Sequence, residues 1–302
     1  MSSSEIPRSA RDNKTTLHIA QIGRGHGHAL AKWQALRTSP DVEAVGLFDS
    51  VDEAGEALAD PSVVAVAVES RNHLSLALAE AAIAAGKHLW LDKPAGDDWP
   101  RFQRLMQQAG ERGLHVQLGY MFRYHPGFVD AAERARTGQL GEVFAIRAHM
   151  STSIDLAERR EQSRHRGGIL YDLGGHMIDQ IVWLLGSPQR VSSTLRNNAT
   201  PELPDYADNT LAVLEFSSGL ATIEIAAMET PPTKRRFEVF GTHGTAIVEP
   251  FDPGPGGVPR QALYERELAA FVGVVRDGKA RDRSSEHELL VQETLLRATG
   301  AI

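Results

Sequence analysis

The chain of 302 residues is long enough for two domains of ordinary size, and its 42% hydrophobic content allows a full core to be buried. Its formal net charge of −7 argues against a nucleic-acid-binding protein, which would normally present a basic face. The absence of cysteine excludes disulfides, thiolate catalysis and cysteine-based zinc sites.

The chain begins with a polar segment, residues 1–16, that has no apolar signal core, and we predict a disordered tail there. Apolar residues nowhere run to the ~18 that are needed to cross a bilayer. We therefore expect a cytoplasmic protein that has no membrane partner.

An apolar strand is predicted at 17–22, and it leads directly into a glycine turn and a helical pattern over 29–37. Such a unit begins a dinucleotide-binding fold, because glycines let the backbone approach a pyrophosphate at the helix N-terminus. Gly23 and Gly25 fit the G-x-G-x-x-G pattern, whereas His28 stands at its third glycine. We predict cofactor contacts from Gly23, Gly25, His26, Gly27 and His28.

A second strand is predicted at 42–48 and ends at Asp49, which lies 24 residues after Gly25 (49 − 25). This offset is near the ~20 residues expected for the acid that binds the ribose hydroxyls of a dinucleotide. An acid there repels a 2′-phosphate, so NAD is expected and NADP is less favoured, unless a basic neighbour admits it. The alternative is an ordinary loop aspartate after a strand.

The alternation of strands and helices continues as far as residue 121. An apolar run at 63–68 and segments at 88–91 and 114–119 predict strands, and 72–85 and 98–112 predict helices. This pattern indicates a doubly wound parallel sheet over 17–121, whose ligands bind beyond the carboxyl ends of the strands. The residues there that we expect to hold the cofactor are Glu69, Asn72, His73, Asp92, Lys93 and Pro94.

Lys93 follows a predicted strand and would lie beside the cofactor crevice. A buried lysine there can polarise or deprotonate a substrate hydroxyl. The alternative is a surface lysine that pairs with Asp92 or Asp97.

The segment 167–179 places Asp172, His176 and Asp179 at i, i+4 and i+7, on one face of a helix. Apolar residues 181–185 and then Gly186 predict that the helix has a buried body and ends there. The segment therefore offers a carboxylate and an imidazole for catalysis. The alternative is an aspartate that favours the helix dipole and a core histidine with a satisfied hydrogen bond.

The second half, residues 122–302, predicts an α+β domain with a mostly antiparallel open sheet. Helices are expected at 124–138, 168–186 and 285–299, and the 168–186 helix should pack on one face of the sheet. The strands are expected at 143–150, 190–197, 210–217, 220–228, 235–240 and 244–249.

The segment 155–166 carries five basic residues just before the 168–186 helix. It would contact an acidic substrate or, as we favour, form a solvated mobile loop. His165, His176 and Asp172 match no standard ligand spacing, so no metal is predicted.

These landmarks resemble, in the same order, the Gfo/Idh/MocA oxidoreductase family, and the resemblance runs from Leu17 onward. The matching motifs are the turn 23–28, Asp49, and the stretches 85–94, 122–126, 141–143 and 167–179. The chain departs from the family pattern at His28, at Asp92 in place of glutamate, and at 68–69 in place of Thr-Pro. Family members usually continue further, so a C-terminal element is expected to be short or missing.

The resemblance implies roles for the candidate site residues. His176 would be the general base, Lys93 would steady the developing alkoxide and hold the cofactor ribose, and Asp172 would bind a substrate hydroxyl. Arg123 and His125 are expected to reach the substrate. The resemblance also implies a homodimer or homotetramer formed through the second sheet.

We therefore predict an NAD-dependent oxidoreductase that transfers a hydride between the nicotinamide and a polyol, sugar or sugar derivative. One alternative keeps the cofactor but uses transient oxidation to drive elimination or glycoside cleavage. The other is a non-catalytic nucleotide-binding sensor, which would be expected to lack Lys93 or His176.

Overall fold

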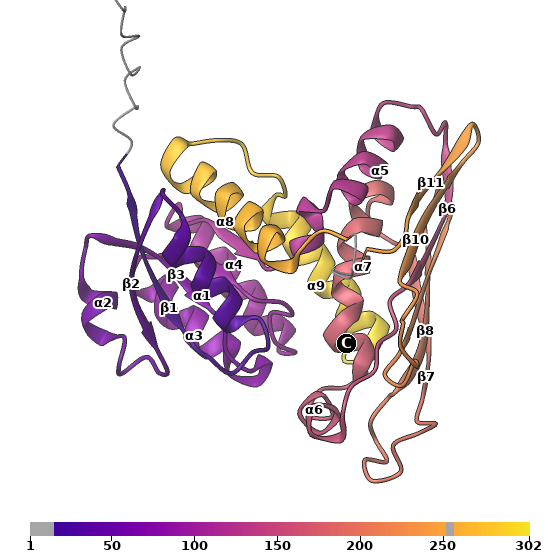
Figure 1. Cartoon of the computed structure of the whole chain (residues 1–302), viewed down its shortest axis with the longest axis horizontal. Coiled ribbons are helices and arrows are strands. Elements are labelled where there is room, and N and C mark those ends of the chain that lie inside the picture. Colours follow the sequence, from indigo (N-terminus) through magenta and orange to yellow (C-terminus); the bar gives the residue numbers. More distant parts are fainter. Residues whose placement is uncertain (1–14, 252–256) are drawn as a thin grey trace, which may run out of the picture.

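The computed structural model describes residues 15–251 and 257–302, which form two parts, each built on one sheet (Figure 1). Of the predicted disordered tail, residues 1–14 lie outside the described residues. Within the described part of the chain, no helix is both long and apolar enough to cross a membrane.

The first sheet has five strands in the order β2-β1-β3-β4-β5, and every neighbouring pair is parallel. β3 is apolar throughout and almost fully buried, as expected for a central strand that is covered by helices on both faces. This confirms the predicted doubly wound sheet. Its elements are β1 (Leu17–Ile22), α1 (Ala29–Thr38), β2 (Val42–Phe48), α2 (Gly55–Ala59), β3 (Val63–Val68), α3 (Asn72–Ala84), β4 (His88–Leu91), α4 (Trp99–Glu111) and β5 (Val116–Leu118).

The second sheet has six strands in the order β11-β10-β6-β9-β8-β7. Its neighbouring pairs are antiparallel except β6 and β9, which confirms the predicted mostly antiparallel sheet. Short turns join β8 to β9 and β10 to β11, whereas the parallel pair is separated by helices and two other strands. The strands are β6 (Val143–His149), β7 (Arg190–Arg196), β8 (Asn209–Glu215), β9 (Leu220–Ala226), β10 (Arg236–Gly241) and β11 (Gly244–Val248).

The helix α7 (Ile169–Leu185) lies on one face of the second sheet, between this sheet and the first part (Figure 1). The helix begins after Gly168, whose φ of +52° favours glycine. A side chain would not fit there either, because a Cβ would lie 2.5 Å from the Ala207 carbonyl oxygen. Gly186 follows the helix at its other end, as predicted. Asp172 lies in the first turn of α7, and His176 lies in the buried turn that follows.

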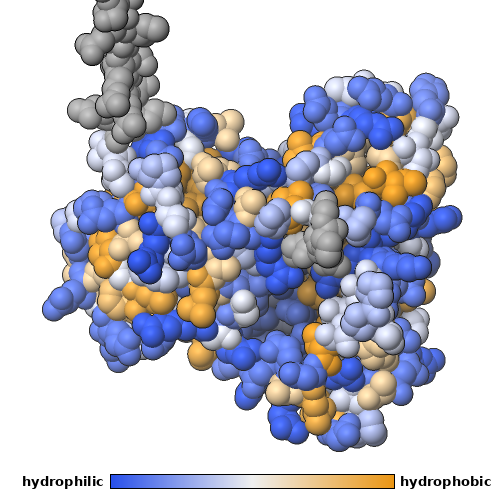
Figure 2. Space-filling view, viewed as in Figure 1, coloured by the Kyte–Doolittle hydropathy of each residue, from blue (hydrophilic) through white to orange (hydrophobic). Residues whose placement is uncertain are grey.

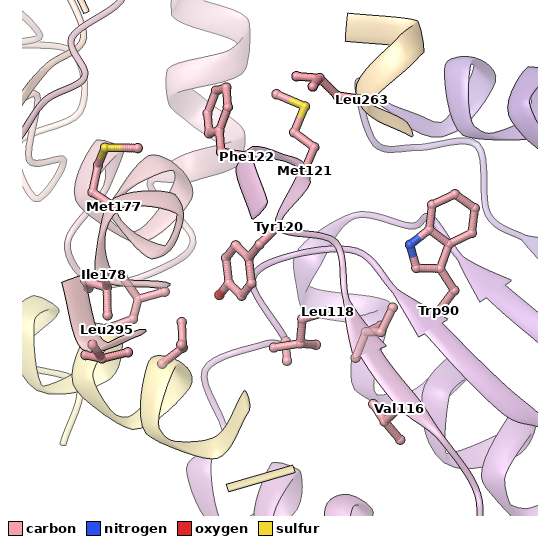
Figure 3. Packing of buried hydrophobic residues seen from close by; sticks show 14 of the residues in the cluster. Trp90, Val116, Leu118, Tyr120, Met121, Phe122, Met177, Ile178, Leu263 and Leu295 are labelled. Carbon is pink, nitrogen blue, oxygen red and sulfur yellow. The ribbon is translucent and has the colours of Figure 1, made fainter. Parts of the chain in front are cut away.

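Residues 120–124 join the two parts. Tyr120 is fully buried, and its ring points from the end of β5 toward α7, the helix that carries Met177 and Ile178 (Figure 3). The chain then forms the short 3-10 helix η1 (Met121–Tyr124) and the helix α5 (Pro126–Arg136). The linking helix predicted at 124–138 therefore begins two residues later than expected, at a proline, which suits the first position of a helix. The junction is therefore a packed core and not a loose linker.

The last two helices, α8 (Arg260–Asp277) and α9 (Ser285–Thr299), return from the second sheet to the first part. α8 packs on α1, and α9 packs on α4 and β5 as well as on α7. The helix at 285–299 was predicted, but the one at 260–277 was not. Its buried residues Leu263, Leu268, Phe271 and Val272 do recur at helical spacing, so the sequence carried that signal.

The basic segment 155–166 differs from the mobile loop that we favoured. Residues Leu156–Gln162 form the helix α6, whose N-cap Asp155 accepts a hydrogen bond from the Glu158 backbone amide. Arg159 is bound to the rest of the second part, because its guanidinium donates to the Ile154 and Ala227 carbonyl oxygens. This helix contributes to the site described next.

Candidate active site

A pocket of about 280 Å³ opens beyond the carboxyl ends of the first sheet, where the chain also approaches α7. Figure 2 shows the surface hollowed between the two parts. This is the position where an open α/β sheet binds its ligands, because β1 and β3 lead to helices on opposite faces there. Seven of the predicted site residues line the pocket, namely Gly25, His26, Gly27, His28, Lys93, Asp172 and His176.

The glycine turn has room for a pyrophosphate at the N-terminus of α1. Gly23 has φ +102°, and a Cβ there would lie 2.7 Å from the Glu69 backbone carbon, so only glycine fits. Gly27 is exposed, and a Cβ built on it would meet no heavy atom within 4 Å. A ligand can therefore approach this backbone closely, which is what dinucleotide binding requires.

Asp49 lies at the carboxyl end of β2, outside the 280 Å³ pocket. Its carboxylate is 3.2 Å from Nε of Arg24, and both side chains are exposed. Its backbone amide donates to Glu53, which brings a second carboxylate to the same place. Two carboxylates and one guanidinium therefore lie together at the end of β2.

Asn72 and His73 line a small extension of the crevice together with His26 and Asp172. They begin α3 directly after β3, as their place in the alternating pattern predicted. Pro94 is buried and does not line either cavity.

Lys93 connects the first part with α7. It is 1% exposed, and its Nζ donates to the backbone oxygen of Asp172 at 2.8 Å and to its carboxylate at 3.3 Å. The alternative of a surface lysine that pairs with Asp92 or Asp97 is therefore wrong. The ammonium group is instead buried at the pocket wall.

The Asp172 carboxylate is held from its other side as well. Gln162 of α6 donates to Oδ2 at 2.9 Å, and the Tyr206 hydroxyl donates to Gln162 at 2.6 Å. Burial alone would raise the pKa of Asp172, but Lys93 and His26 hold that pKa below its ordinary value. Asp172 is thus an ionised acceptor with a fixed orientation.

His176 lies one helical turn after Asp172 and is 2% exposed. Its ring packs edge-on against Phe122 and Tyr120, at centroid distances of 5.0 and 5.7 Å. Burial first, and then Lys93, keep the pKa of His176 well below its ordinary value. Nδ1 is buried without a hydrogen-bond partner, which leaves Nε2 as the nitrogen that can meet a ligand in the pocket.

The prediction that the side chains of Glu69 and Asp92 hold the cofactor needs correction. Both side chains are buried, and neither lines the pocket. They contact the fully buried Lys32, with 3.0 Å between its Nζ and each carboxylate. Glu267 of α8 approaches the same Nζ at 3.5 Å and accepts from the Trp90 indole at 2.6 Å. The acids that follow β3 and β4 can therefore be buried, because each contacts the buried ammonium group of Lys32.

His26 and His28 of the glycine turn both point their rings toward Asp92. Their Nδ1 atoms lie 2.7 and 3.5 Å from Oδ2 of Asp92, and the three are the only group in the described part of the chain with the proximity to share a metal ion. The 2.7 Å contact brings the His26 ring against a buried carboxylate oxygen that makes no hydrogen bond within the described part of the chain. His28, which stands at the third glycine position of the turn, points its ring to Asp92 and Tyr264.

Arg123 and His125 are not brought into the pocket, so their predicted contacts with the substrate need correction. Arg123 is buried in a network in which its guanidinium donates to both Asp179 and Glu288 at 2.7 Å. His125 caps α5, because its Nδ1 accepts from the Gly127 amide at 3.1 Å. Both side chains are engaged in structural contacts.

Several pocket residues were not predicted. Gln162 and Glu158 come from α6, and the Asp155-to-Glu158 spacing would have indicated a helix start. Arg71 follows β3 and pairs with Glu158 at 3.2 Å. The remaining ones carry no motif of their own: Met121, Met150, Thr152, Ile154, Leu173, Arg235 and Arg260.

Two family profiles match the chain. Residues 9–120 match the oxidoreductase family with an NAD-binding Rossmann fold, and residues 128–247 match the GFO/IDH/MocA C-terminal domain. The chain spans 63% to 65% of the length of three curated oxidoreductases that it also matches.

Two of the matching relatives carry the name of an enzyme activity. A scyllo-inositol 2-dehydrogenase (NAD⁺) of Bacillus subtilis is 29% identical over 74% of this chain and 71% of its own length. A D-xylose 1-dehydrogenase (NADP⁺) of Haloferax volcanii is 24% identical over 93% of this chain and 91% of its own.

The fold is also that of a solved relative. The crystal structure of GenD2 from gentamicin A biosynthesis, in complex with NAD, superposes with a TM-score of 0.83 at 23% identity and covers 98% of this chain and 97% of GenD2. Because the two profiles together cover most of the chain, the protein belongs to the GFO/IDH/MocA oxidoreductase family.

Proposed function

We propose that the protein is an NAD-dependent dehydrogenase of a polyol, sugar or sugar derivative. The observation that carries the proposal is the convergence of Lys93, Asp172 and His176 on one pocket beside the glycine turn. The names of the inositol and xylose dehydrogenases that resemble the chain support this class of substrate.

The glycine turn and Asp49 would hold the dinucleotide, and the bound nicotinamide supplies the hydride acceptor. His176 takes the proton of the substrate hydroxyl at Nε2, because its lowered pKa keeps the ring neutral near pH 7. Lys93 stabilises the negative charge that develops on that oxygen. Asp172 accepts a hydrogen bond from a neighbouring hydroxyl and keeps Lys93 in place.

The experiment that tests the proposal is a screen of inositols, aldoses and sugar acids for net reduction of NAD by the purified protein. We expect one group of related substrates to give steady nicotinamide reduction. Product formed from a glycoside without net reduction would favour the transient-oxidation alternative. If no compound reacts and no nucleotide binds, the proposal is contradicted.

The cofactor preference depends on Asp49, and we expect Asp49→Ala to weaken NAD binding about tenfold while NADP binding changes little. The reason is that the carboxylate binds ribose hydroxyls and repels a 2′-phosphate. Titrations of both nucleotides with protein that has been stripped of bound nucleotide measure the effect. Arg24→Ala is the matched variant and should weaken NADP only; an equal loss of NAD and NADP in Asp49→Ala would contradict the ribose contact.

Gln162 gives a pH-dependent prediction. In Gln162→Glu a second carboxylate would face Asp172, which raises the pKa of Asp172 toward neutrality. A group that must be ionised loses function as pH falls through its pKa, so the acid limb of the kcat/KM profile should move to higher pH. We expect activity about tenfold lower near pH 6 that recovers at higher pH. A uniform loss at all pH values would mean that Gln162 has a packing role only.

The open face of the second sheet supports a further proposal, that two copies of the chain pair through it. This face exposes Leu211, Leu220 and Ile247, each 44% exposed or more. Light scattering should show a homodimer or homotetramer, and the double variant Leu211→Glu with Leu220→Glu should dissociate it. A monomeric parent protein would contradict the proposal.

A further inference from the structure

A second cavity lies outside the cofactor crevice. It has a volume of about 750 Å³ and is bounded by η1, α5, the C-terminal half of α7 and the loop 278–284. It shares no lining residue with the 280 Å³ pocket. A volume of this size accommodates a small molecule, and its charges decide which kind.

Arg283 is the central charge of this cavity. Its guanidinium stacks on Trp183, with 3.6 Å between Cζ and the ring centre, and the side chain is half-buried. Nη1 donates to the backbone oxygen of Asp282, whereas Nε is buried without a hydrogen-bond partner. Burial lowers the pKa of Arg283, and Arg123 adds to this effect, although Asp179 opposes it. The structure thus holds a partly desolvated cation whose hydrogen bonds are incomplete.

Two further arginines line the same cavity. Cζ of Arg136 lies 5.6 Å from the centre of the Trp183 ring, and Nη1 of Arg281 donates to Oγ of Ser285 at 2.8 Å. Among residues 15–251 and 257–302, no carboxylate comes within 4.0 Å of the guanidinium nitrogens of Arg136, Arg281 or Arg283. Their charges therefore remain available to a ligand.

The acidic residues of the cavity do not cancel these charges. Glu133 and Asp282 also line the cavity, but both side chains are exposed. The fourth arginine of the lining, Arg123, is already matched by Asp179 and Glu288. Three arginines against two exposed acids leave an excess of positive charge inside the cavity.

Part of the lining is apolar, since Phe128, Val129 and Ala132 of α5 also border the cavity. The cavity thus joins an arginine cluster to an apolar surface. We propose that it binds a small organic phosphate, whose phosphate group contacts Arg281 and Arg283 and whose body packs against α5. Arginine forks match phosphate oxygens in pairs, and the remaining volume exceeds what a bare anion would fill.

The test is a calorimetric titration of the full chain with inorganic phosphate and with phenyl phosphate. Both should bind, and phenyl phosphate should bind about tenfold more tightly because its ring is buried against α5. Arg283→Gln and Arg281→Gln should each weaken binding about tenfold or more. Arg281 is exposed, so its substitution leaves the fold intact. The matched control is Arg37→Gln, which removes the same charge from an exposed site on α1 and should change nothing.

Phosphate bound at the glycine turn would give the opposite pattern, because it would be displaced by NADH and would survive both arginine substitutions. The proposed site should keep its affinity in saturating NADH. Binding that is unaffected by Arg281→Gln and Arg283→Gln, or abolished by NADH, would overturn the proposal. Failure of the dehydrogenase assignment would leave this result unchanged, since the two cavities are separate.

Discussion

His176→Ala is expected to lower kcat for oxidation of the substrate by about 10²- to 10⁴-fold, the usual contribution of a positioned general base. The buried imidazole has no charged hydrogen-bond partner, and its role in the pocket is to accept the hydroxyl proton. Nucleotide affinity should stay nearly unchanged, because the ring lies on α7 and not on the glycine turn. Steady-state kinetics and a nucleotide titration on the same preparation measure both effects.

The matched control is His125→Asn, which replaces a buried histidine outside the pocket and keeps an acceptor for the Gly127 amide. Its turnover should remain close to that of the parent protein. If His176→Ala keeps its turnover, the general-base role is lost, and Lys93 becomes the next candidate.

Lys32→Met is expected to reduce the free energy of unfolding by about 3–5 kcal/mol, the cost of removing one partner from a buried ion cluster. Lys32 is fully buried and offsets three carboxylates, those of Glu69, Asp92 and Glu267. Methionine fills a similar volume but leaves these charges unpaired. Urea unfolding followed by circular dichroism measures the loss.

The deficit should depend on pH. Burial and Asp92 raise the pKa of Glu69 while Lys32 lowers it, so removing Lys32 raises that pKa further. A carboxyl whose pKa is higher in the folded than in the unfolded state contributes stability at low pH, and that contribution is lost as pH rises through the folded pKa. The deficit of Lys32→Met should therefore be smaller near pH 5 than near pH 8.

Lys87→Met provides the control, because Lys87 is also buried but, within residues 15–251 and 257–302, donates only to the Asp60 backbone oxygen. Its loss should cost about 1 kcal/mol and show little of this pH dependence. Equal deficits in the two variants would mean that the three carboxylates are already neutral in the parent protein.

Much of the fold could be predicted because it follows from local patterns. The apolar run of β3 and the alternation of strands with helices placed the parallel sheet, and the spacing of Asp172 and His176 placed both on one face of α7. These features depend only on neighbouring residues. The packing of α8 on α1 depends instead on contacts between distant segments, and it was missed.

The site was less predictable where side chains form ion pairs with residues that are distant in the sequence. Asp179 follows His176 by three residues, yet it pairs with Arg123, which the motif had suggested for the substrate. Glu288, on the other side of this arginine, is 165 residues away from it in sequence. Likewise Asp92 is the neighbour of Lys93 in the chain, but its carboxylate faces Lys32. Which charged groups pair is determined by burial and charge compensation in the folded state, and neither can be read from the local sequence.

The measurement that tests the central claim most directly is transfer of deuterium from the substrate carbon to the nicotinamide. A polyol or sugar from the screen, deuterated at the oxidised carbon, is incubated with the protein and NAD, and the nucleotide is analysed by mass spectrometry. We expect one deuterium in the NADH formed by the parent protein and almost none with His176→Ala. NADH that carries no deuterium, or deuterium transfer that is unchanged in His176→Ala, would contradict the account.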